Sequence, residues 1–213
     1  MEILAQLWDV ILHVDVYLGD IINQFGAWSY LIIFAIIFCE TGLVIAPFLP
    51  GDSLLFAAGA FAAKGYFDIV WLYLIITIAA ILGDMLNYRL GRWFGPRVFR
   101  NERSRFFNKN YLERTHHFYQ KYGGKTIILA RFIPIVRTFA PFVAGVGAMS
   151  YWQFAIYNIA GALIWSTLFT FGGYFFGNLE IVKQNFSAFI LIIIAASLFP
   201  GIIQYIKHKI SRD

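Results

Sequence analysis

Long apolar runs constrain this chain more than any other feature of its sequence. A helix needs about 20 predominantly apolar residues to cross the hydrocarbon core of a bilayer, and the 213 residues contain several runs of that order. Hydrophobic residues make up 60% of the chain and charged residues 14%, against about 25% charged in ordinary soluble domains. We therefore predict an all-α integral membrane protein and exclude a disordered chain, a nucleic-acid-binding domain and a soluble enzyme.

Charged side chains are unevenly distributed along the chain. Residues 97–125 carry eight Lys or Arg and two acids, whereas residues 1–30 carry four acids and no Lys or Arg. Because basic loops stay in the cytoplasm, we expect 97–125 and the basic C-terminus on the cytoplasmic side, and the acidic N-terminal segment outside. The basic loop either fixes topology alone or also attracts anionic lipid head groups.

The pattern of apolar runs and breaks predicts a single membrane domain over residues 1–213. The expected segments are an amphipathic surface helix at 1–25, a re-entrant hairpin at 30–63, a membrane helix at 66–94, a basic cytoplasmic loop at 97–125, a second re-entrant hairpin at 126–149, and membrane helices at 151–177 and 186–206. Each hairpin is short for two crossings, and irregular backbone at membrane depth needs surrounding protein or water.

The two halves of the chain resemble each other. Each contains a proline-broken hairpin, an Ala-Gly pair and then a helix that ends in G-x-x-x-G, formed by Gly91 and Gly95 or by Gly173 and Gly177. With oppositely oriented hairpins, this order predicts an inverted repeat of the kind found in transporters. Chance similarity between two Gly- and Pro-rich membrane segments is the alternative.

Two acids lie in the first predicted hairpin. Glu40 and Asp52 are twelve residues apart, about 18 Å along a continuous helix. The breaks at Pro47 and Pro50 would instead bring them to a similar depth on two arms. Two nearby carboxylates resist double ionisation, so such a pair can take up and release a proton near neutral pH. The alternative is that each acid only neutralises an arginine.

Two arginines lie in the second predicted hairpin. Arg131 and Arg137 are six residues apart with Pro134 between them, and Pro141 follows. The helix break would let both guanidinium groups point into one cavity, where their planar donor forks suit a lipid phosphate. The alternative is that both side chains extend toward the membrane interface. Charge inside a bilayer is rare because it costs about 2.5–3.5 kcal/mol per residue on insertion scales.

Two further polar residues, Asp84 and Asn87, lie in the predicted helix 66–94 as supporting candidates. Asp84 could pair with Arg89 or with an arginine of the second hairpin. The chain contains no zinc-binding motif, P-loop, nucleophile elbow or cysteine cluster, so we expect no metal, no cofactor and no enzymatic activity.

Several motifs resemble those of a known family. They are Cys39-Glu40-Thr41-Gly42, Pro47-Phe48-Leu49-Pro50-Gly51-Asp52-Ser53, Gly83-Asp84, and Arg131-Phe132-Ile133-Pro134-Ile135-Val136-Arg137-Thr138. The chain resembles, over essentially its whole length, the DedA family of bacterial inner-membrane proteins, within the VTT-domain or SNARE-associated superfamily, and is similar to the family's founding member.

This resemblance implies two re-entrant hairpins that meet from opposite sides of the membrane. It also implies lipid translocation, because bacterial members are linked to flipping undecaprenyl phosphate or phosphatidylethanolamine and eukaryotic relatives scramble phospholipids. Some bacterial members depend on the proton-motive force. The positions that match Glu40, Asp52, Arg131 and Arg137 are functionally required in the family.

We therefore expect a flippase or scramblase that moves a phosphorylated lipid between leaflets of the inner membrane. Arg131 and Arg137 would bind the phosphate, and Glu40 and Asp52 would exchange a proton or compete for the arginines. The alternatives are a proton-coupled ion or drug exporter, a lipid-pyrophosphate phosphatase, and an assembly factor without transport. Membrane lipids are the expected partners, nucleic acid is not, and glycine-rich helix faces permit a homo-oligomer.

Overall fold

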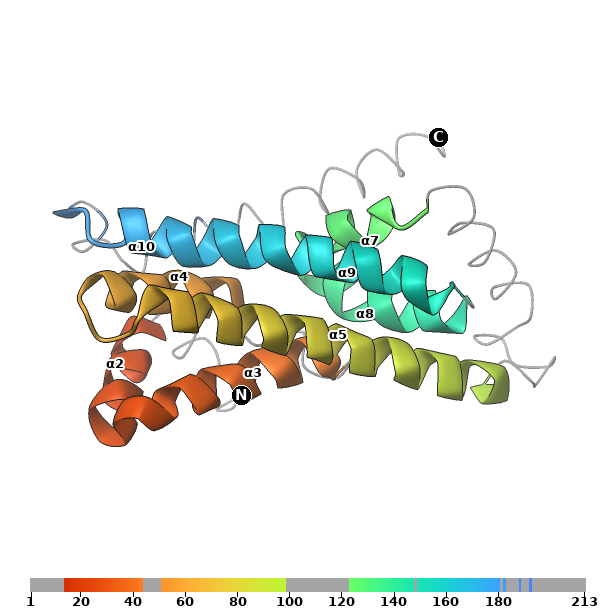
Figure 1. Cartoon of the computed structure of the whole chain (residues 1–213), viewed down its shortest axis with the longest axis horizontal. Helices are drawn as coiled ribbons and strands as arrows, with labels where there is room; N and C mark the ends of the chain where they lie inside the picture. Colours follow the sequence, from red (N-terminus) through yellow and green to blue (C-terminus); the bar gives the residue numbers. More distant parts are fainter. Residues whose placement is uncertain are drawn as a thin grey trace. The chain divides into compact units, whose positions relative to one another are not determined.

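The computed structural model describes residues 14–43, 51–98, 123–147 and 149–180, together with residues 182, 188 and 192, and within these ranges every regular element is a helix (Figure 1). The elements are α2 (Val14–Phe25), the 3-10 turn η1 (Gly26–Trp28), α3 (Ser29–Gly42), α4 (Gly51–Ala63), α5 (Ile69–Val98), α7 (Lys125–Ala130), α8 (Pro134–Val146), α9 (Tyr151–Ser166), the π-helical segment η2 (Thr167–Phe171) and α10 (Gly172–Phe176).

Three helical stretches are long and apolar enough to cross a membrane: Val16–Gly42, Ile69–Phe94 and Tyr151–Phe176. Large apolar side chains on them, such as Trp71 and Ile156, are more than half exposed, as expected where lipid replaces water. The prediction of a helical, multi-pass membrane protein is thus confirmed. Helices α4 and α8 have 13 residues each and span about 20 Å, less than the core of about 30 Å.

The described helices fall within the predicted segments as follows. The first predicted hairpin corresponds to α3 and α4, and the second to α7 and α8. The predicted surface helix is described from Val14, and residues 16–25 belong to the first candidate span. The predicted basic loop and last membrane helix lie largely outside the described residues. The re-entrant course of the hairpins and their opposite orientation stay predictions.

Local sequence signals explain where several helices begin. Asp68 caps α5, because its Oδ1 accepts hydrogen bonds from the backbone N–H groups of Val70 (2.9 Å) and Trp71 (3.1 Å). Helix α8 begins with Pro134 in its first turn, where a missing N–H costs nothing. Gly65, with φ of 85°, makes the turn between α4 and α5.

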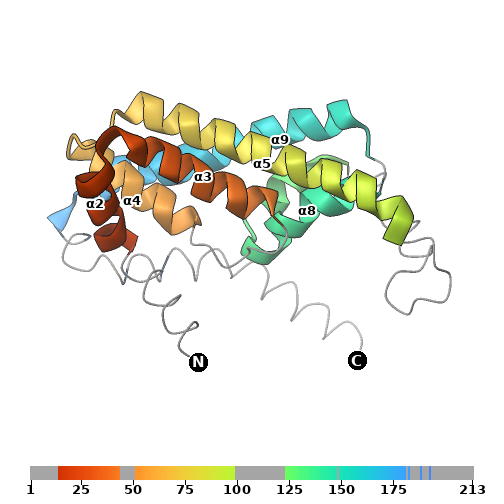
Figure 2. The same ribbon diagram turned by 90° about the horizontal axis from the view of Figure 1, so that it is seen from below.

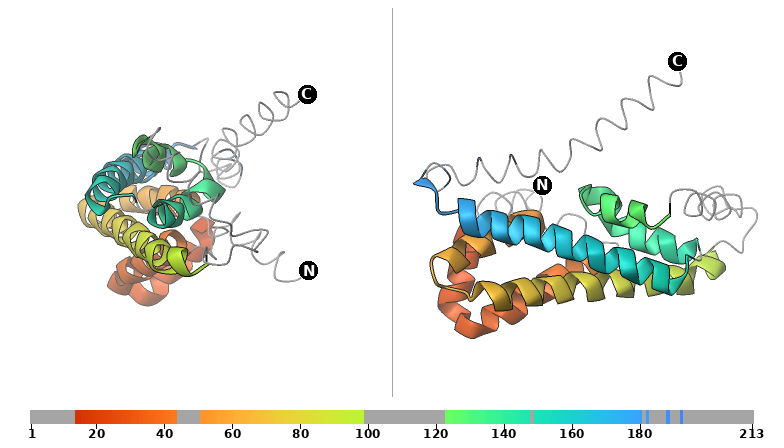
Figure 3. Two further views of the ribbon diagram at one scale, coloured as in Figure 1. Left: turned by 90° about the vertical axis from the view of Figure 1, so that its right-hand side faces the viewer. Right: turned by 45° about the horizontal axis from the view of Figure 1, so that its top comes forward.

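The chain divides into two compact units. The first comprises Met1–Ile36, Phe48–Thr77 and Trp165–Asp213, and the second Ile37–Pro47 and Ile78–Ile164. In the first unit, α4 packs against α10, η2 and α2 (Figure 2). In the second unit, α7 packs against α8 (Figure 3).

The second unit has an aromatic centre. The rings of Tyr88 on α5 and Phe154 on α9 stack with centroids 4.4 Å apart, and both side chains are buried. Ile127, Ala140 and Ala144 belong to the same cluster of buried side chains. Small alanines on α8 allow this helix to approach α5 closely, as is common in membrane helix packing.

Glycines bring α4 and α10 into backbone contact in the first unit. A Cβ at Gly59 would lie 2.9 Å from the amide nitrogen of Tyr174 and would collide with the carbonyl oxygen of Thr170. A Cβ at Gly173 would lie 2.7 Å from the carbonyl carbon of Phe56. Since real Cβ atoms do not come this close, only glycine fits at either position.

The second unit contains the same arrangement on α8 and α5. A Cβ at Gly145 would lie 2.8 Å from the amide nitrogen of Arg92 and would collide with the carbonyl oxygen of Tyr88, and one at Gly91 would lie 2.8 Å from the carbonyl carbon of Phe142. The spacing is identical, because in each unit both glycines meet a residue three positions before the opposite glycine. In both units the short helix runs in the same direction as the longer helix that it contacts (Figure 1).

Adjacent glycines on α10 allow a matched test of this packing. Gly173→Ala should destabilise the protein by about 1–3 kcal/mol, because the methyl group overpacks against Phe56. Gly172→Ala should be neutral or stabilising by up to about 1 kcal/mol, because a Cβ at Gly172 meets nothing within 4 Å. Thermal unfolding in detergent measures both, and equal effects of the two substitutions would contradict the close contact.

Candidate functional site

A buried ion pair joins α3 and α8 in the second unit. Nη2 of Arg137 donates to Oε1 of Glu40, and the two residues are 8% and 2% exposed. Glu40 lies near the end of α3, and Arg137 lies one turn after Pro134, with its backbone N–H bonded to the carbonyl of Ile133 at 2.9 Å. The proline start of α8 thus fixes the backbone from which this guanidinium group projects.

A second buried ion pair lies in the same unit. Nη2 of Arg131, the residue that follows α7, donates to Oδ2 of Asp84 on α5 and to Oδ1 of Asn158 on α9, the latter at 2.6 Å. Asn158 is fully buried, and its Nδ2 donates to the carbonyl of Ile81 at 3.1 Å. A Cβ at Gly161 would lie 3.4 Å from Nε of Arg131, so this glycine leaves room for the guanidinium group.

The depth of Asp84 places this second pair inside the membrane-spanning segment. Asp84 lies fifteen residues after Ile69 and ten before Phe94 in the candidate span, about 22 Å and 15 Å along a helix. At such depth an ionised side chain needs a partner of opposite sign. Arg131 and Arg137 are both buried, so neither side chain extends to the surface as the interfacial alternative required.

Asp52, the other predicted acid, lies in the first unit. It is in the first turn of α4, and its Oδ1 accepts a hydrogen bond from Nε1 of Trp165 at 2.9 Å. The hydroxyl of Ser166 next to Trp165 bonds that of Thr77 at 2.8 Å, and the π-helical segment η2 follows directly. Such segments are rare and occur frequently at functional sites.

The structure places two of the acids beside the arginines in the second unit and the third acid in the first unit, a division that the sequence did not specify. Glu40 and Asp84 each hold one arginine, whereas Asp52 belongs to the other unit, so proton sharing between Glu40 and Asp52 stays a prediction. Of the two partners considered for Asp84, Arg89 and an arginine of the second predicted hairpin, the structure shows a pair with Arg131 of that hairpin. Pro47 and Pro50 lie outside the described residues, and Pro141 lies inside α8.

Sequence reasoning missed two contributing residues, Asn158 and Trp165. Asn158 is a polar residue in the apolar run 151–177, and that isolation was the one available signal. Trp165 carried no signal, because tryptophan is common in membrane helices and its indole partner lies over a hundred residues away. In the described part of the chain, no three His, Cys, Asp or Glu side chains gather into a metal site.

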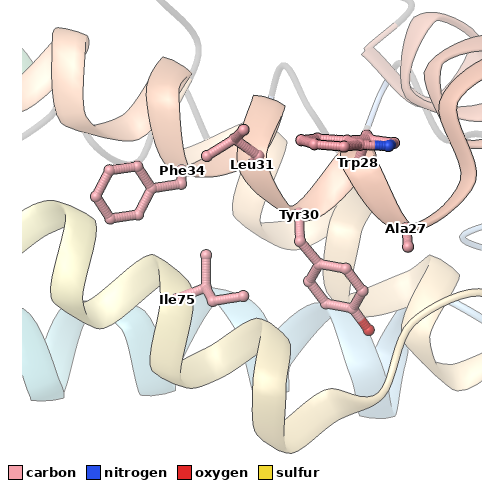
Figure 4. Close-up of a pocket in the computed structure, with 6 residues that line it drawn as sticks. All are labelled: Ala27, Trp28, Tyr30, Leu31, Phe34 and Ile75. Carbon is pink, nitrogen blue, oxygen red and sulfur yellow. The ribbon is translucent and has the colours of Figure 1, made fainter.

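An apolar groove lies on the first unit, between the start of α3 and α5 (Figure 4). Trp28, Leu31 and Phe34 follow one another along one wall, and Ile75 faces them from α5 (Figure 4). The hydroxyl of Tyr30 accepts a hydrogen bond from the backbone N–H of Asp68. Because no lining side chain is charged, this groove does not suit a phosphate.

The fold and site define a multi-pass helical membrane protein with two buried arginine–carboxylate pairs. The family model of the VTT domain matches residues 49–175. The chain is 54% identical over 211 residues to the protein DedA of Escherichia coli K12, covering 98% of this chain and 96% of DedA. No solved structure matches the chain.

Two further relatives are less similar to this chain than DedA. The chain is 46% identical over 168 residues to an uncharacterized membrane protein of Mycobacterium leprae, covering 79% and 75% of the two chains. It is 35% identical over 182 residues to the inner membrane protein YqjA of Escherichia coli, covering 85% and 82%. The chain therefore belongs to the VTT-domain family, as a DedA-family protein of the inner membrane similar to DedA.

A double-mutant cycle tests the coupling between Arg137 and Glu40. Each single change, Arg137→Gln or Glu40→Gln, should destabilise the protein by about 3–5 kcal/mol, because it leaves one buried charge without its partner. The double change should cost less than the sum of the two, since it removes both charges together. Reversible unfolding in detergent gives the three values, and strict additivity would contradict the buried pair. Arg89→Gln, at an exposed position of α5, is the control.

Proposed function

We propose that this protein is a lipid transporter that moves a phosphorylated lipid between the leaflets of the inner membrane. The observation that supports this best is the pair of buried arginines in one unit, each held by a carboxylate on another helix. Guanidinium groups recognise phosphate oxygens with the same donor fork that they present to carboxylates. An arginine that binds a carboxylate in this site can therefore bind a lipid phosphate in its place.

The charge on Glu40 would decide whether Arg137 binds this acid or a lipid phosphate. While Glu40 is ionised it occupies Arg137, and a lipid phosphate has to compete for the guanidinium group. When Glu40 takes up a proton, the attraction between the two side chains is lost, and Arg137 can accept the phosphate instead. Protonation of Asp84 would release Arg131 in the same way. Asp52, which lies in the first unit, is proposed to take up and release protons there. The lipid tails stay in the bilayer throughout.

We also propose that the chain is an inverted repeat with two re-entrant hairpins. Its support is the matched set of backbone contacts at Gly59 and Gly173 in one unit and at Gly145 and Gly91 in the other. In each case a short helix from one half of the sequence packs against a long helix from the other half. Transporters that bind their substrate at mid-membrane contain such repeats, in which short helices of each half do not span the core. Here each short helix packs against a long helix of the other half.

Leaflet exchange in proteoliposomes tests the function. Vesicles of phosphatidylethanolamine and phosphatidylglycerol would carry a fluorescent phosphatidylglycerol or labelled undecaprenyl phosphate, and dithionite would bleach the outer leaflet. Wild-type protein should accelerate exchange, and Arg131→Ala and Arg137→Ala should each slow it by about tenfold or more, since each removes a charged hydrogen-bond donor. Arg89→Gln should retain the wild-type rate.

Other outcomes identify the alternatives. No exchange above protein-free vesicles, with or without a pH gradient, would overturn lipid transport. Release of inorganic phosphate from a lipid pyrophosphate would favour a phosphatase. Cation-dependent proton movement that needs the acids but not the arginines would favour an exporter. Substitutions that affect only folding and yield would favour an assembly factor.

Asp52 allows its charge and its hydrogen bond to be separated. Asp52→Asn keeps an amide oxygen for the indole of Trp165 but removes the carboxylate charge. If Asp52 exchanges protons, this variant should keep a melting temperature close to that of wild type and lose its response to a pH gradient. Trp165→Phe removes the donor instead and should cost about 1–2 kcal/mol of stability. A fully pH-responsive Asp52→Asn variant would remove Asp52 from the mechanism.

A further inference from the structure

Asn87 lies in the second unit and bonds two other helices without taking part in either ion pair. It is fully buried on α5, and its Nδ2 donates to the carbonyl oxygens of Thr41 at 3.1 Å and Thr138 at 2.7 Å. Thr41 follows Glu40 on α3, and Thr138 follows Arg137 on α8. One amide group therefore holds the two backbones that carry the Glu40–Arg137 pair.

The chemistry of the two contacts fixes the orientation of this amide. Both partners are carbonyl oxygens, which only accept, so the NH₂ group must face them and Oδ1 must face away. Oδ1 has no hydrogen-bond partner among the described residues. The side chain thus acts in the described unit purely as a double donor, and both of its N–H groups serve the junction between α3 and α8.

The end of α3 needs such a donor. The last carbonyls of a helix lack intrahelical N–H partners, and Thr41 lies one residue before the end of α3 at Gly42. A Cβ at Gly83 would collide with Thr41 and lie 3.0 Å from the carbonyl oxygen of Phe38, so α3 approaches α5 closely there. Asn87, one turn after Gly83, caps α3 from a neighbouring helix.

The hydrogen-bond ladder of α8 is interrupted near its contact with Asn87. Pro141 lies inside α8 and cannot donate to the carbonyl four residues before it, which weakens the helix around Arg137 and Thr138. A carbonyl oxygen has two lone pairs, so that of Thr138 can accept from Asn87 in addition to its own helix. The hydrogen bond to α5 supports α8 where its own ladder is interrupted.

We propose that Asn87 is a positioning residue for the transport site. It fixes the separation of α3 and α8, and hence the distance at which Glu40 and a lipid phosphate compete for Arg137. The effect on transport rests on the function proposed above. The clamp, by which we mean the two hydrogen bonds from Asn87 to Thr41 and Thr138, does not depend on that function. Both hydrogen bonds from Asn87 go to backbone carbonyls next to the ion pair, so its effect passes through the two backbones.

The test measures the junction and transport separately. Spin labels would be placed at Leu43 and Phe139, which lie next to the junction and are each 43% exposed, in a Cys39→Ala background. Asn87→Leu removes both donors at similar volume, and Asn87→Asp, a second variant of nearly the same shape, places a carboxylate oxygen against two carbonyls. Tyr30→Phe is the matched control, because it removes a hydrogen bond between a side chain and a backbone group from the first unit.

Both Asn87 variants should broaden the distance distribution between the labels and slow exchange of fluorescent phosphatidylglycerol by about tenfold per folded molecule. Tyr30→Phe should change neither the distance distribution nor the rate of exchange. An unchanged distance distribution in both Asn87 variants would overturn the clamp, whatever transport does. A broadened distribution with wild-type transport would overturn the positioning role. If wild-type protein moves no lipid, the proposed function fails, and the distance distribution alone still decides the clamp.

Discussion

The ionised arginine buried in a membrane protein is the constraint on which the rest of the second unit depends. Arg131 and Arg137 lie away from the surface, and a charge at membrane depth is stable only beside an opposite charge and satisfied hydrogen bonds. Helix α5 meets much of this requirement. It supplies Asp84 to Arg131 and, through Asn87, holds the backbones beside Glu40 and Arg137.

Close backbone packing makes these polar contacts reachable. A carboxylate on α3 and an amide on α5 can serve the same arginine-bearing helix only if the helices approach to within the length of short side chains. Gly83 allows α3 to approach α5, and Gly91 and Gly145 allow α8 to do so. Without water between helices, such van der Waals contact and interhelical hydrogen bonding are the main sources of association. The glycines and the polar residues are thus parts of one arrangement.

The sequence predicted the class of fold because apolar length and scarcity of charge leave few alternatives in a bilayer. It also predicted Glu40, Asp52, Arg131 and Arg137 as candidates, since each is an ionisable residue in an apolar run. It could not predict which acid holds which arginine, because pairing depends on contacts between segments 47 and 97 residues apart. Asn158 and Trp165 were missed for the same reason, as their partners lie on distant segments of the chain.

Stability alone does not account for two such pairs in one unit. Replacing a buried ion pair with well-packed apolar residues is often neutral or stabilising, and this chain packs apolar and glycine-rich helices readily elsewhere. An arginine held by a carboxylate, however, can be released by a proton or a competing anion, which an apolar contact cannot. In a protein that only needed rigid helices, this sensitivity would be a weakness. In the lipid transporter proposed above, which has to bind a phosphate inside a membrane and release it again, the same sensitivity would let the site alternate between an arginine held by an acid and one that holds a phosphate.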